Sequence, residues 1–200
     1  MLIDHSDEPM MRLLVNTTRQ ADLAGPALAE AHRDVGRQLA GSVARHLIIE
    51  DVAINHVAGT STGVRVRAGS EPIVVAVMRA GLFVAEGIWS SLPGSSFVLH
   101  SNRNSLDTLP ASRRTVVIVD SVINTGRSIR EVLKALDPLK PACIVVATLV
   151  AYRTTLEKLM KDFADVHFHV ARISDRSYVG KGSTDTGARL FGTTTWNCEA

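Results

Sequence analysis

The amino-acid sequence predicts an α/β fold in which helices cover both faces of a parallel sheet. From residue 72 onward, short runs rich in valine and isoleucine, such as "PIVVAVM", "TVVIVD" and "ACIVVATLVA", alternate with segments of helical character. Continuous apolar runs of this length are typical of strands buried on both faces, and their alternation with helices indicates βαβ units. The 200 residues contain no internal repeat, low-complexity segment or linker, so we expect a single domain over residues 1–200.

The composition indicates an ordinary globular protein of the cytoplasm. The sequence is 46% hydrophobic and 21% charged, and its net charge is only +2, which argues against a nucleic-acid-binding tail or a membrane-surface protein. The longest apolar stretch, 142–151, is far shorter than the ~18 residues of a membrane span. The acidic N-terminal segment lacks the basic start and apolar core of a signal peptide. Cys143 lies in an apolar run and Cys198 near the end, so we expect no disulfide framework and a reducing compartment.

Residues 1–50 are predicted to form a helical segment whose main helix covers 22–45. Its apolar residues recur near helical spacing and are Leu23, Leu28, Val35, Leu39 and Val43. A long amphipathic helix of this kind is typical of a packing or subunit-contact element. The following stretch "HVAGTSTGVRV" predicts a β-hairpin that turns around Gly59 to Gly63.

The remaining elements follow from the alternation of apolar runs and breaker residues. Strands are predicted at 72–78, 95–100, 115–120, 142–151 and 165–173, and helices at 82–92, 126–139 and 153–163. Ligands of such sheets bind beyond the carboxyl ends of the strands. The loops at these ends carry unusual polar content: "RAG" after Met78, "SNRNSLDT", "DSVINTGRS" and "ISDRSYVGKGSTDTGARLFGT". We therefore expect the chemistry there.

The loop "DSVINTGRS" has the residues of a phosphate-binding turn. Unpaired backbone N–H groups at a helix start carry the positive end of the helix dipole, and Gly126 lets a ligand approach the backbone. The hydroxyls of Thr125 and Ser128 add hydrogen-bond donors, and together these groups form a nest for a phosphate. Asp120 suits the diol of a sugar, so one ligand with a ribose and a phosphate is indicated. An N-cap followed by a tight turn explains the same residues equally well from this loop alone.

The "RAG" loop places Arg79 directly after a buried strand. A guanidinium binds pyrophosphate in a bidentate manner, and the two small residues after it permit unusual backbone geometry. An arginine at a strand end is more often a solvated charge, and Arg103 in "SNRNSLDT" is equally ambiguous by itself. His167 and His169 alternate on one predicted strand and are interpreted as structural, and neither His56 nor His100 has the spacing of a metal site.

Four segments, in the same order, resemble the type I phosphoribosyltransferases, and within that class the uracil phosphoribosyltransferase family. The segment "VVIVDSVINTGRS" resembles the loop that binds phosphoribosyl pyrophosphate (PRPP). The other three are "VVAVMRAGLFVAEGI", "SNRNSLDTLP" and "SYVGKGSTDTGARLFGTTTW", and the resemblance covers about three-quarters of the chain. It implies the parallel-sheet fold of that class with a small C-terminal hood at 171–195.

The resemblance also implies roles for individual residues. Those implied to bind PRPP are Arg79, Ala80, Gly81, Arg103, Asp120, Ser121, Val122, Ile123, Asn124, Thr125, Gly126, Arg127, Ser128 and Asp185, with Asp120, Arg79, Arg103 and Asp185 as the catalytic set. Those implied to surround the base are Tyr178, Val179, Thr184, Asp185 and Thr186. A cis peptide bond is expected between Arg79 and Ala80. Mg²⁺ is expected to be held by PRPP and water, with no direct protein ligand.

The implied activity is transfer of a phosphoribosyl group from PRPP to uracil, giving UMP and pyrophosphate. Four positions depart from the family pattern: Ser121 stands for a proline, Arg127 for a glycine, Thr184 for a glycine and Ala188 for an acid. The side chain of Thr184 would crowd a pocket that reads the base through backbone groups, or its hydroxyl would recognise another ring substituent. Two alternatives remain: a phosphoribosyltransferase for another heterocycle, and a regulatory protein that senses PRPP or nucleotide. We expect a homodimer or homotetramer and no nucleic-acid partner.

Overall fold

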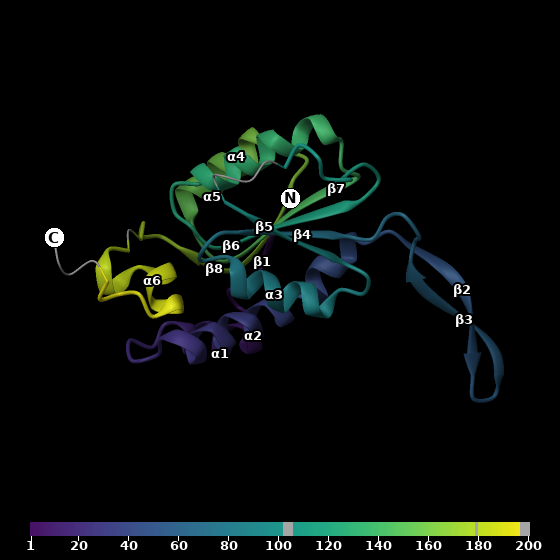
Figure 1. The fold of residues 1–200 in the computed structure, drawn as a ribbon, viewed down its shortest axis with the longest axis horizontal. Helices are drawn as coiled ribbons and strands as arrows, with labels where there is room; N and C mark the ends of the chain where they lie inside the picture. The colour runs from purple at the N-terminus through teal and green to yellow at the C-terminus, as the bar shows by residue number, and fades with distance from the viewer. Residues whose placement is uncertain (102–105, 179, 197–200) are drawn as a thin grey trace.

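The computed structural model describes residues 1–101, 106–178 and 180–196 and confirms the predicted fold class. Six strands form one parallel sheet in the order β1-β8-β7-β6-β4-β5 (Figure 1). Their bounds are β1 Leu2–Asp4, β4 Ile73–Val77, β5 Ser96–His100, β6 Thr115–Ile123, β7 Cys143–Tyr152 and β8 His167–Ser174. β4, β6 and β7 lie in the interior of this sheet and are the valine- and isoleucine-rich runs from which the sheet was expected.

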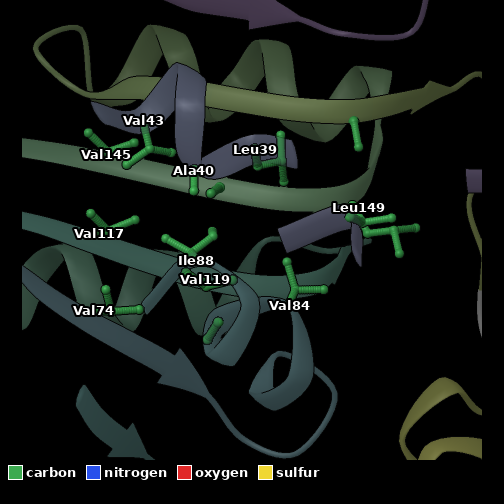
Figure 2. Close-up of a cluster of buried hydrophobic side chains, with 14 of the residues drawn as sticks. Leu39, Ala40, Val43, Val74, Val84, Ile88, Val117, Val119, Val145 and Leu149 are labelled. Atoms are coloured by element: carbon green, nitrogen blue, oxygen red, sulfur yellow. The ribbon is translucent and has the colours of Figure 1, made fainter. Parts of the chain in front are cut away.

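Helices cover the two faces of the sheet, and side chains of each strand alternate between them. One face carries α1 (Pro9–Thr18), α2 (Gly25–Val43) and α3 (Leu82–Ser91), and the other carries α4 (Arg127–Leu136) and α5 (Arg153–Asp162). Figure 2 shows the first layer, where Val117 and Val119 of β6 pack with side chains of α2 and α3. Val116 and Ile118 point to the opposite cluster, with α4 and α5. In the described part of the chain, no helix combines the length and apolarity needed to cross a membrane.

The N-terminal segment contains more than the predicted helix. The structure adds β1, whose three residues pair with β8, and α1, which packs beside α2. A run of three residues is too short to show a period, so β1 could not be identified from the sequence. The main helix is confirmed but begins at Gly25, with Pro26 in its first turn, and not at residue 22.

The predicted hairpin is confirmed, but its turn lies elsewhere. β2 (Ile49–His56) and β3 (Gly59–Val66) pair so that His56 faces Gly59, which leaves Val57 and Ala58 as the two-residue turn. Gly63, expected in the turn, is paired inside β3 because a two-residue loop closes the hairpin earlier. The hairpin projects from the sheet, away from α6 (Figure 1). Four of its large apolar residues are exposed: Ile49, Ile54, Val57 and Val64.

Two further differences concern the functional end of the sheet. β6 was expected to end at Asp120 but continues to Ile123, because Val122 and Ile123 still pair with Val150 and Ala151 of β7. The C-terminal segment contains a 3₁₀ turn at Gly182–Thr184 and the short helix α6 (Thr186–Phe191). Leu190 of α6 packs against α2, which fixes the C-terminal segment above the carboxyl ends of the strands.

Candidate active site

Three of the predicted loops meet at the carboxyl edge of the sheet. β4 and β6 are neighbours with Ala76 paired to Val119, so the loop after Val77 begins beside Asp120. The C-terminal segment closes over both. A cavity of about 320 Å³ lies between them, lined by Val77, Met78, Arg79, Ala80, Asp120, Val122, Ser128, Tyr178, Gly180, Asp185, Thr186 and Gly187. The predicted carboxylates and the predicted guanidinium therefore share one cavity.

Asp120 is the partly buried carboxylate at the centre of this edge. Burial raises the pKa of Asp120 from 3.8 to about 7, and hydrogen bonds from the backbone N–H groups of Val122 and Ser121 offset part of that effect. Because the neutral and ionised forms are both accessible near pH 7, ligand hydroxyl groups that donate to the carboxylate would favour its ionised form. Asp120 can thus bind a diol without an ion-pair partner.

A smaller cavity of about 130 Å³ lies between Asp120 and the start of α4. It is lined by Asp120, Val122, Ile123, Asn124, Thr125, Gly126, Arg127, Ser128 and Ile129. Gly126 is the N-cap of α4 and has a left-handed conformation, with φ of 72°. The first residues of α4 line the cavity, so this end of the helix borders it. The backbone N–H groups at a helix start are unpaired and carry the positive end of the helix dipole. The arrangement suits a phosphate group.

Two hydrogen bonds to Asn124 hold this loop in place. The carbonyl oxygen of Asn124 accepts a hydrogen bond from Thr155 Oγ1 at 2.6 Å, and its side-chain Oδ1 accepts one from the Tyr178 N–H at 3.1 Å. Asn124 therefore connects the loop to α5 and to the C-terminal segment. Arg127 is exposed and forms an ion pair with Glu131 one turn along α4. Its side chain is that of a solvent-facing residue in a first helical turn.

The Arg79 loop packs directly on the backbone of β6. A Cβ atom at Gly81 would lie 2.4 Å from the carbonyl oxygen of Val119 and 3.0 Å from the Asp120 Cα, so only glycine fits. The cis peptide bond joins Met78 to Arg79, one residue before the expected Arg79–Ala80 step. The loop hydrogen bond that closes this turn joins the Gly81 N–H to the Val77 carbonyl oxygen at 3.0 Å, so the bend starts at the end of β4. The Arg79 guanidinium lies 5.7 Å from the centre of the Phe191 ring.

The predicted base-binding residues belong to the C-terminal segment. The Asp185 carboxylate caps α6 by accepting a hydrogen bond from the Ala188 N–H at 2.7 Å. The Thr184 hydroxyl accepts a hydrogen bond from the Lys181 N–H and donates one to the Lys181 carbonyl oxygen, both at 3.0 Å. Tyr178 donates its phenolic hydrogen to the Thr184 carbonyl oxygen. The Thr184 hydroxyl is thus used to close the turn at Gly182–Thr184.

The structure brings together most of the predicted set, with five exceptions. Gly81 lies behind the cavity as a packing residue. Ser121 points away from it, because neighbouring strand residues face opposite sides, and lines a third cavity. Thr184 lies in the turn at Gly182–Thr184 and lines none of the three cavities at this edge of the sheet. Arg103 and Val179 lie outside the described residues. Sequence reasoning did not single out Gly180 and Gly187, which line the 320 Å³ cavity, nor Arg172 on β8.

One group of metal-ligating side chains occurs among the described residues, and it is remote from this site. Ligand atoms of His46, Cys143 and His167 lie within 4.8 Å of one another. Cys143 begins β7 and His167 begins β8, so the group lies at the amino ends of the strands, whereas Asp120 lies toward the carboxyl ends. His169, interpreted as structural, is fully buried.

A cavity at a helix start, next to a carboxylate and at the carboxyl edge of a parallel sheet, is the arrangement expected of a type I phosphoribosyltransferase. A family model described as "Uracil phosphoribosyltransferase" matches residues 5–193. The chain therefore belongs to the uracil phosphoribosyltransferase family and is a pentosyltransferase.

Two curated relatives and two solved structures illustrate the match. The uracil phosphoribosyltransferases of Staphylococcus haemolyticus and Staphylococcus carnosus are each 28% identical, over 94% of this chain and 96% of theirs. The AQ2163 protein from Aquifex aeolicus superposes with a TM-score of 0.82 at 21% identity, over 96% of this chain and 98% of its own. Orotate phosphoribosyltransferase of Mycobacterium tuberculosis, in complex with PRPP, superposes with a TM-score of 0.51 at 15% identity, over 86% of this chain and 93% of its own. These two structures confirm the fold.

Proposed function

We propose that the protein transfers the 5-phosphoribosyl group of PRPP to a pyrimidine base and releases pyrophosphate. Uracil is the base we propose, and UMP is then the product. The observation that carries this proposal is the position of Asp120, which lines both the 130 Å³ cavity at the start of α4 and the 320 Å³ cavity that contains Arg79. A ribose seated at Asp120 would direct its 5′-phosphate toward α4 and its pyrophosphate toward Arg79. The PRPP bound to the orotate phosphoribosyltransferase named above supports the same ligand class.

The proposed reaction is a displacement at the anomeric carbon of the ribose. A ring nitrogen of the base forms the new bond and gives up its proton to water or to the departing pyrophosphate, while the carbon–oxygen bond to pyrophosphate breaks and its electron pair leaves with pyrophosphate. Asp120 would accept hydrogen bonds from the ribose hydroxyls, and the Arg79 guanidinium would neutralise charge on the leaving group. These groups act by orientation and electrostatic stabilisation and need no covalent enzyme intermediate.

The residues of the cavity fit a magnesium ion held mainly by the substrate. Asp120 and Asp185 both line it, and carboxylate oxygens are ligands that Mg²⁺ accepts directly or through water. When bound with PRPP, Mg²⁺ would neutralise part of the pyrophosphate charge. Asp185 already accepts the Ala188 N–H, which orients its carboxylate at the start of α6.

Family membership and the C-terminal turn together favour uracil as the base. The Thr184 hydroxyl is bonded to the backbone of Lys181, so it does not have to act as an added recognition group for another ring substituent. A pocket that reads the base through backbone groups of residues 178 and 180–186 is compatible with this turn. Tyr178 and Val122, which both line the cavity, would supply the apolar contacts.

The direct test is a panel of bases incubated with the protein, PRPP and Mg²⁺. We expect uracil to release pyrophosphate and to give a product with the mass of UMP, measured by a coupled pyrophosphate assay and mass spectrometry. Thymine, cytosine and hypoxanthine serve as controls for specificity. Release of pyrophosphate with none of the bases would overturn the proposal and would favour the PRPP-sensing alternative, whose mark would be salt-sensitive RNA binding.

The glycine at the start of α4 gives a second test. Gly126→Ala is expected to lower stability by about 1–2 kcal/mol, because an L-residue there must adopt a left-handed conformation. Its Cβ would also lie 2.9 Å from Thr155 Cγ2, so either the Thr155 side chain, which bonds the Asn124 carbonyl oxygen, or the loop must shift. We expect the KM for PRPP to rise at least several-fold in steady-state assays.

The matched control is Gly69→Ala. Gly69 has a similar φ of 80° but open space around its Cβ position, and it lies outside the cavities of the site. This variant should lose stability without a change in the KM for PRPP. Equal KM values for the two variants would show that the α4 loop does not hold the substrate.

We also propose that the protein is a homo-oligomer. Val57 is fully exposed at the tip of the β2–β3 hairpin, and Ile49, Ile54 and Val64 are exposed along it. An apolar surface on a projecting hairpin supports a contact between copies of the chain. The helix α2, suggested from the sequence as the contact, has most of its apolar residues in the core. Analytical ultracentrifugation of the intact protein tests the assembly.

A further inference from the structure

A third cavity, of about 330 Å³, lies beside the base end of the candidate active site. It shares Val122, Tyr178 and Thr186 with the cavity that contains Arg79, so the two cavities adjoin. Its other walls come from the ends of α1, β7 and β8 and from α2 and α6. None of the roles proposed above uses this space.

The described residues that line the third cavity include four arginines and no carboxylate. The arginines are Arg19, Arg172, Arg176 and Arg189. The Arg189 guanidinium already makes two hydrogen bonds, since its Nη2 donates to the carbonyl oxygens of Gln20 and Leu23 at 2.6 and 2.7 Å. Within the described chain, the structure gives the side chains of Arg172 and Arg19 no ion pair or hydrogen bond. The cavity thus has an excess of positive charge.

Arg172 is the most informative of these residues. It lies on β8, and its Nε atom is buried without a hydrogen-bond partner among the described residues. Burial, and to a lesser degree the nearby Arg19, lower the pKa of the Arg172 guanidinium. A desolvated guanidinium beside a second cation is unfavourable unless an anion pairs with it.

A second buried group in the same cavity also lacks a partner. Ser121 is 0% exposed and its Oγ makes no hydrogen bond in the described structure. His32, which is 2% exposed, donates from Nδ1 to the Leu28 carbonyl oxygen at 2.9 Å. Burial lowers the pKa of His32 to about 4, so its ring is neutral at neutral pH and adds no positive charge to the cavity. A guanidinium fork and a hydroxyl donor that line the same cavity form a donor set that suits a carboxylate or a phosphate.

We propose that this cavity binds a small organic anion, a carboxylate or a phosphate, next to the pyrimidine, with Arg172 and Ser121 as its main donors. The proposal rests on the proposed function for the identity of the neighbouring ligand. The anion is either a substituent of the acceptor base itself, in which case an acidic pyrimidine is a substrate, or a separate molecule that alters the use of uracil.

The test compares wild-type protein with Arg172→Gln, using uracil, orotate and uracil-5-carboxylate as acceptors in the presence of PRPP and Mg²⁺. Inorganic phosphate and each acid are also added to reactions with uracil. Arg65→Gln, on the hairpin and outside all of these cavities, is the charge-matched control. Ser121→Ala provides a second variant if Arg172→Gln does not fold.

If the acid belongs to the base, an acidic pyrimidine is consumed, and Arg172→Gln lowers its kcat/KM relative to that of uracil by about tenfold or more. If the anion is a separate molecule, an acid or phosphate changes the KM for uracil without being consumed, and Arg172→Gln removes the change. Ser121→Ala should weaken either effect, and Arg65→Gln should leave both as in the wild type. Responses of Arg172→Gln that equal those of Arg65→Gln in every arm would overturn the proposal.

A binding measurement separates this proposal from the proposed function. Thermal unfolding of the wild type and of Arg172→Gln is measured with orotate, uracil-5-carboxylate or inorganic phosphate, without PRPP. Because these probes can also bind the two cavities of the candidate active site, only the part of the rise in Tm that depends on Arg172 reports on the third cavity. A rise in Tm that Arg172→Gln abolishes would support the anion site even if no base released pyrophosphate. Pyrophosphate release from uracil with no anion effect on Tm or kinetics would support the enzyme and reject the anion site.

Discussion

Replacing Asp120 with alanine is expected to lower kcat/KM for PRPP by about a hundredfold or more while the protein stays folded. Each hydrogen bond to a charged group is worth about 1.5–3 kcal/mol, and a ribose diol would make two of them to this carboxylate. The side chain lies at a cavity wall and outside the two hydrophobic clusters that flank the sheet. Steady-state kinetics with varied PRPP, together with circular dichroism, measures both parts of this expectation.

The stability of Asp120 variants should depend on pH in a defined direction. Because burial raises the pKa of Asp120 in the folded state from 3.8 to about 7, the folded protein binds this proton more tightly than the unfolded chain. The contribution of Asp120 to stability therefore decreases as the pH rises from about 4 to 7 and then stays low. Asp120→Asn lacks this group, so its Tm relative to the wild type should increase over that range.

The two Asp120 variants together distinguish a binding role from a structural one. Asp120→Asn keeps the size of the side chain and removes the charge, so it should lose PRPP use and gain stability at pH 8. A carboxylate that only supported the fold would show the opposite pattern. Unchanged PRPP kinetics in both variants would contradict the assignment of this edge of the sheet as the active site.

The position of Asp120 is predictable from sequence because of the residues that precede it. The continuous apolar run Val116–Val119 is typical of a strand buried on both faces. The carboxyl ends of parallel strands lie at one edge of a sheet, which is where ligands bind. The end of β6 is not predictable in the same way. Asp120 and Ser121 interrupt the apolar run, yet Val122 and Ile123 continue the pairing with β7. Polar residues inside a strand are tolerated here because cavities lie on both sides of it.

The third cavity lies beyond what the sequence pattern could indicate. Arg19 follows α1, Arg172 lies within β8 and Arg189 lies in α6, so their side chains converge only through tertiary structure. Each arginine taken alone has the spacing of an ordinary surface charge. The burial of the Arg172 Nε atom and its lack of a partner among the described residues become visible only when the neighbouring elements are in place.

Replacing Gly81 with alanine is expected to damage both stability and activity, through packing alone. Gly81 has φ of −69°, a conformation open to any residue, so the substitution carries no left-handed backbone penalty. The new Cβ would lie 2.4 Å from the Val119 carbonyl oxygen and 2.6 Å from that of Val77. Both atoms belong to the central sheet and cannot move aside. The loop that carries Arg79 must therefore shift away from Asp120.

We expect Gly81→Ala to destabilise the protein by about 1–3 kcal/mol, as other overpacked sites do, measured by urea unfolding. A displacement of about 1 Å at a catalytic group can reduce the rate about a hundredfold, so kcat/KM for PRPP should fall by tenfold or more. Gly41→Ala is the matched control, since Gly41 is an exposed residue of α2 whose Cβ would meet no atom within 4 Å. It should gain up to about 1 kcal/mol from helix propensity. If Gly81→Ala were as stable and active as Gly41→Ala, the close contact between the Arg79 loop and β6 would not be what positions Arg79 and Asp120.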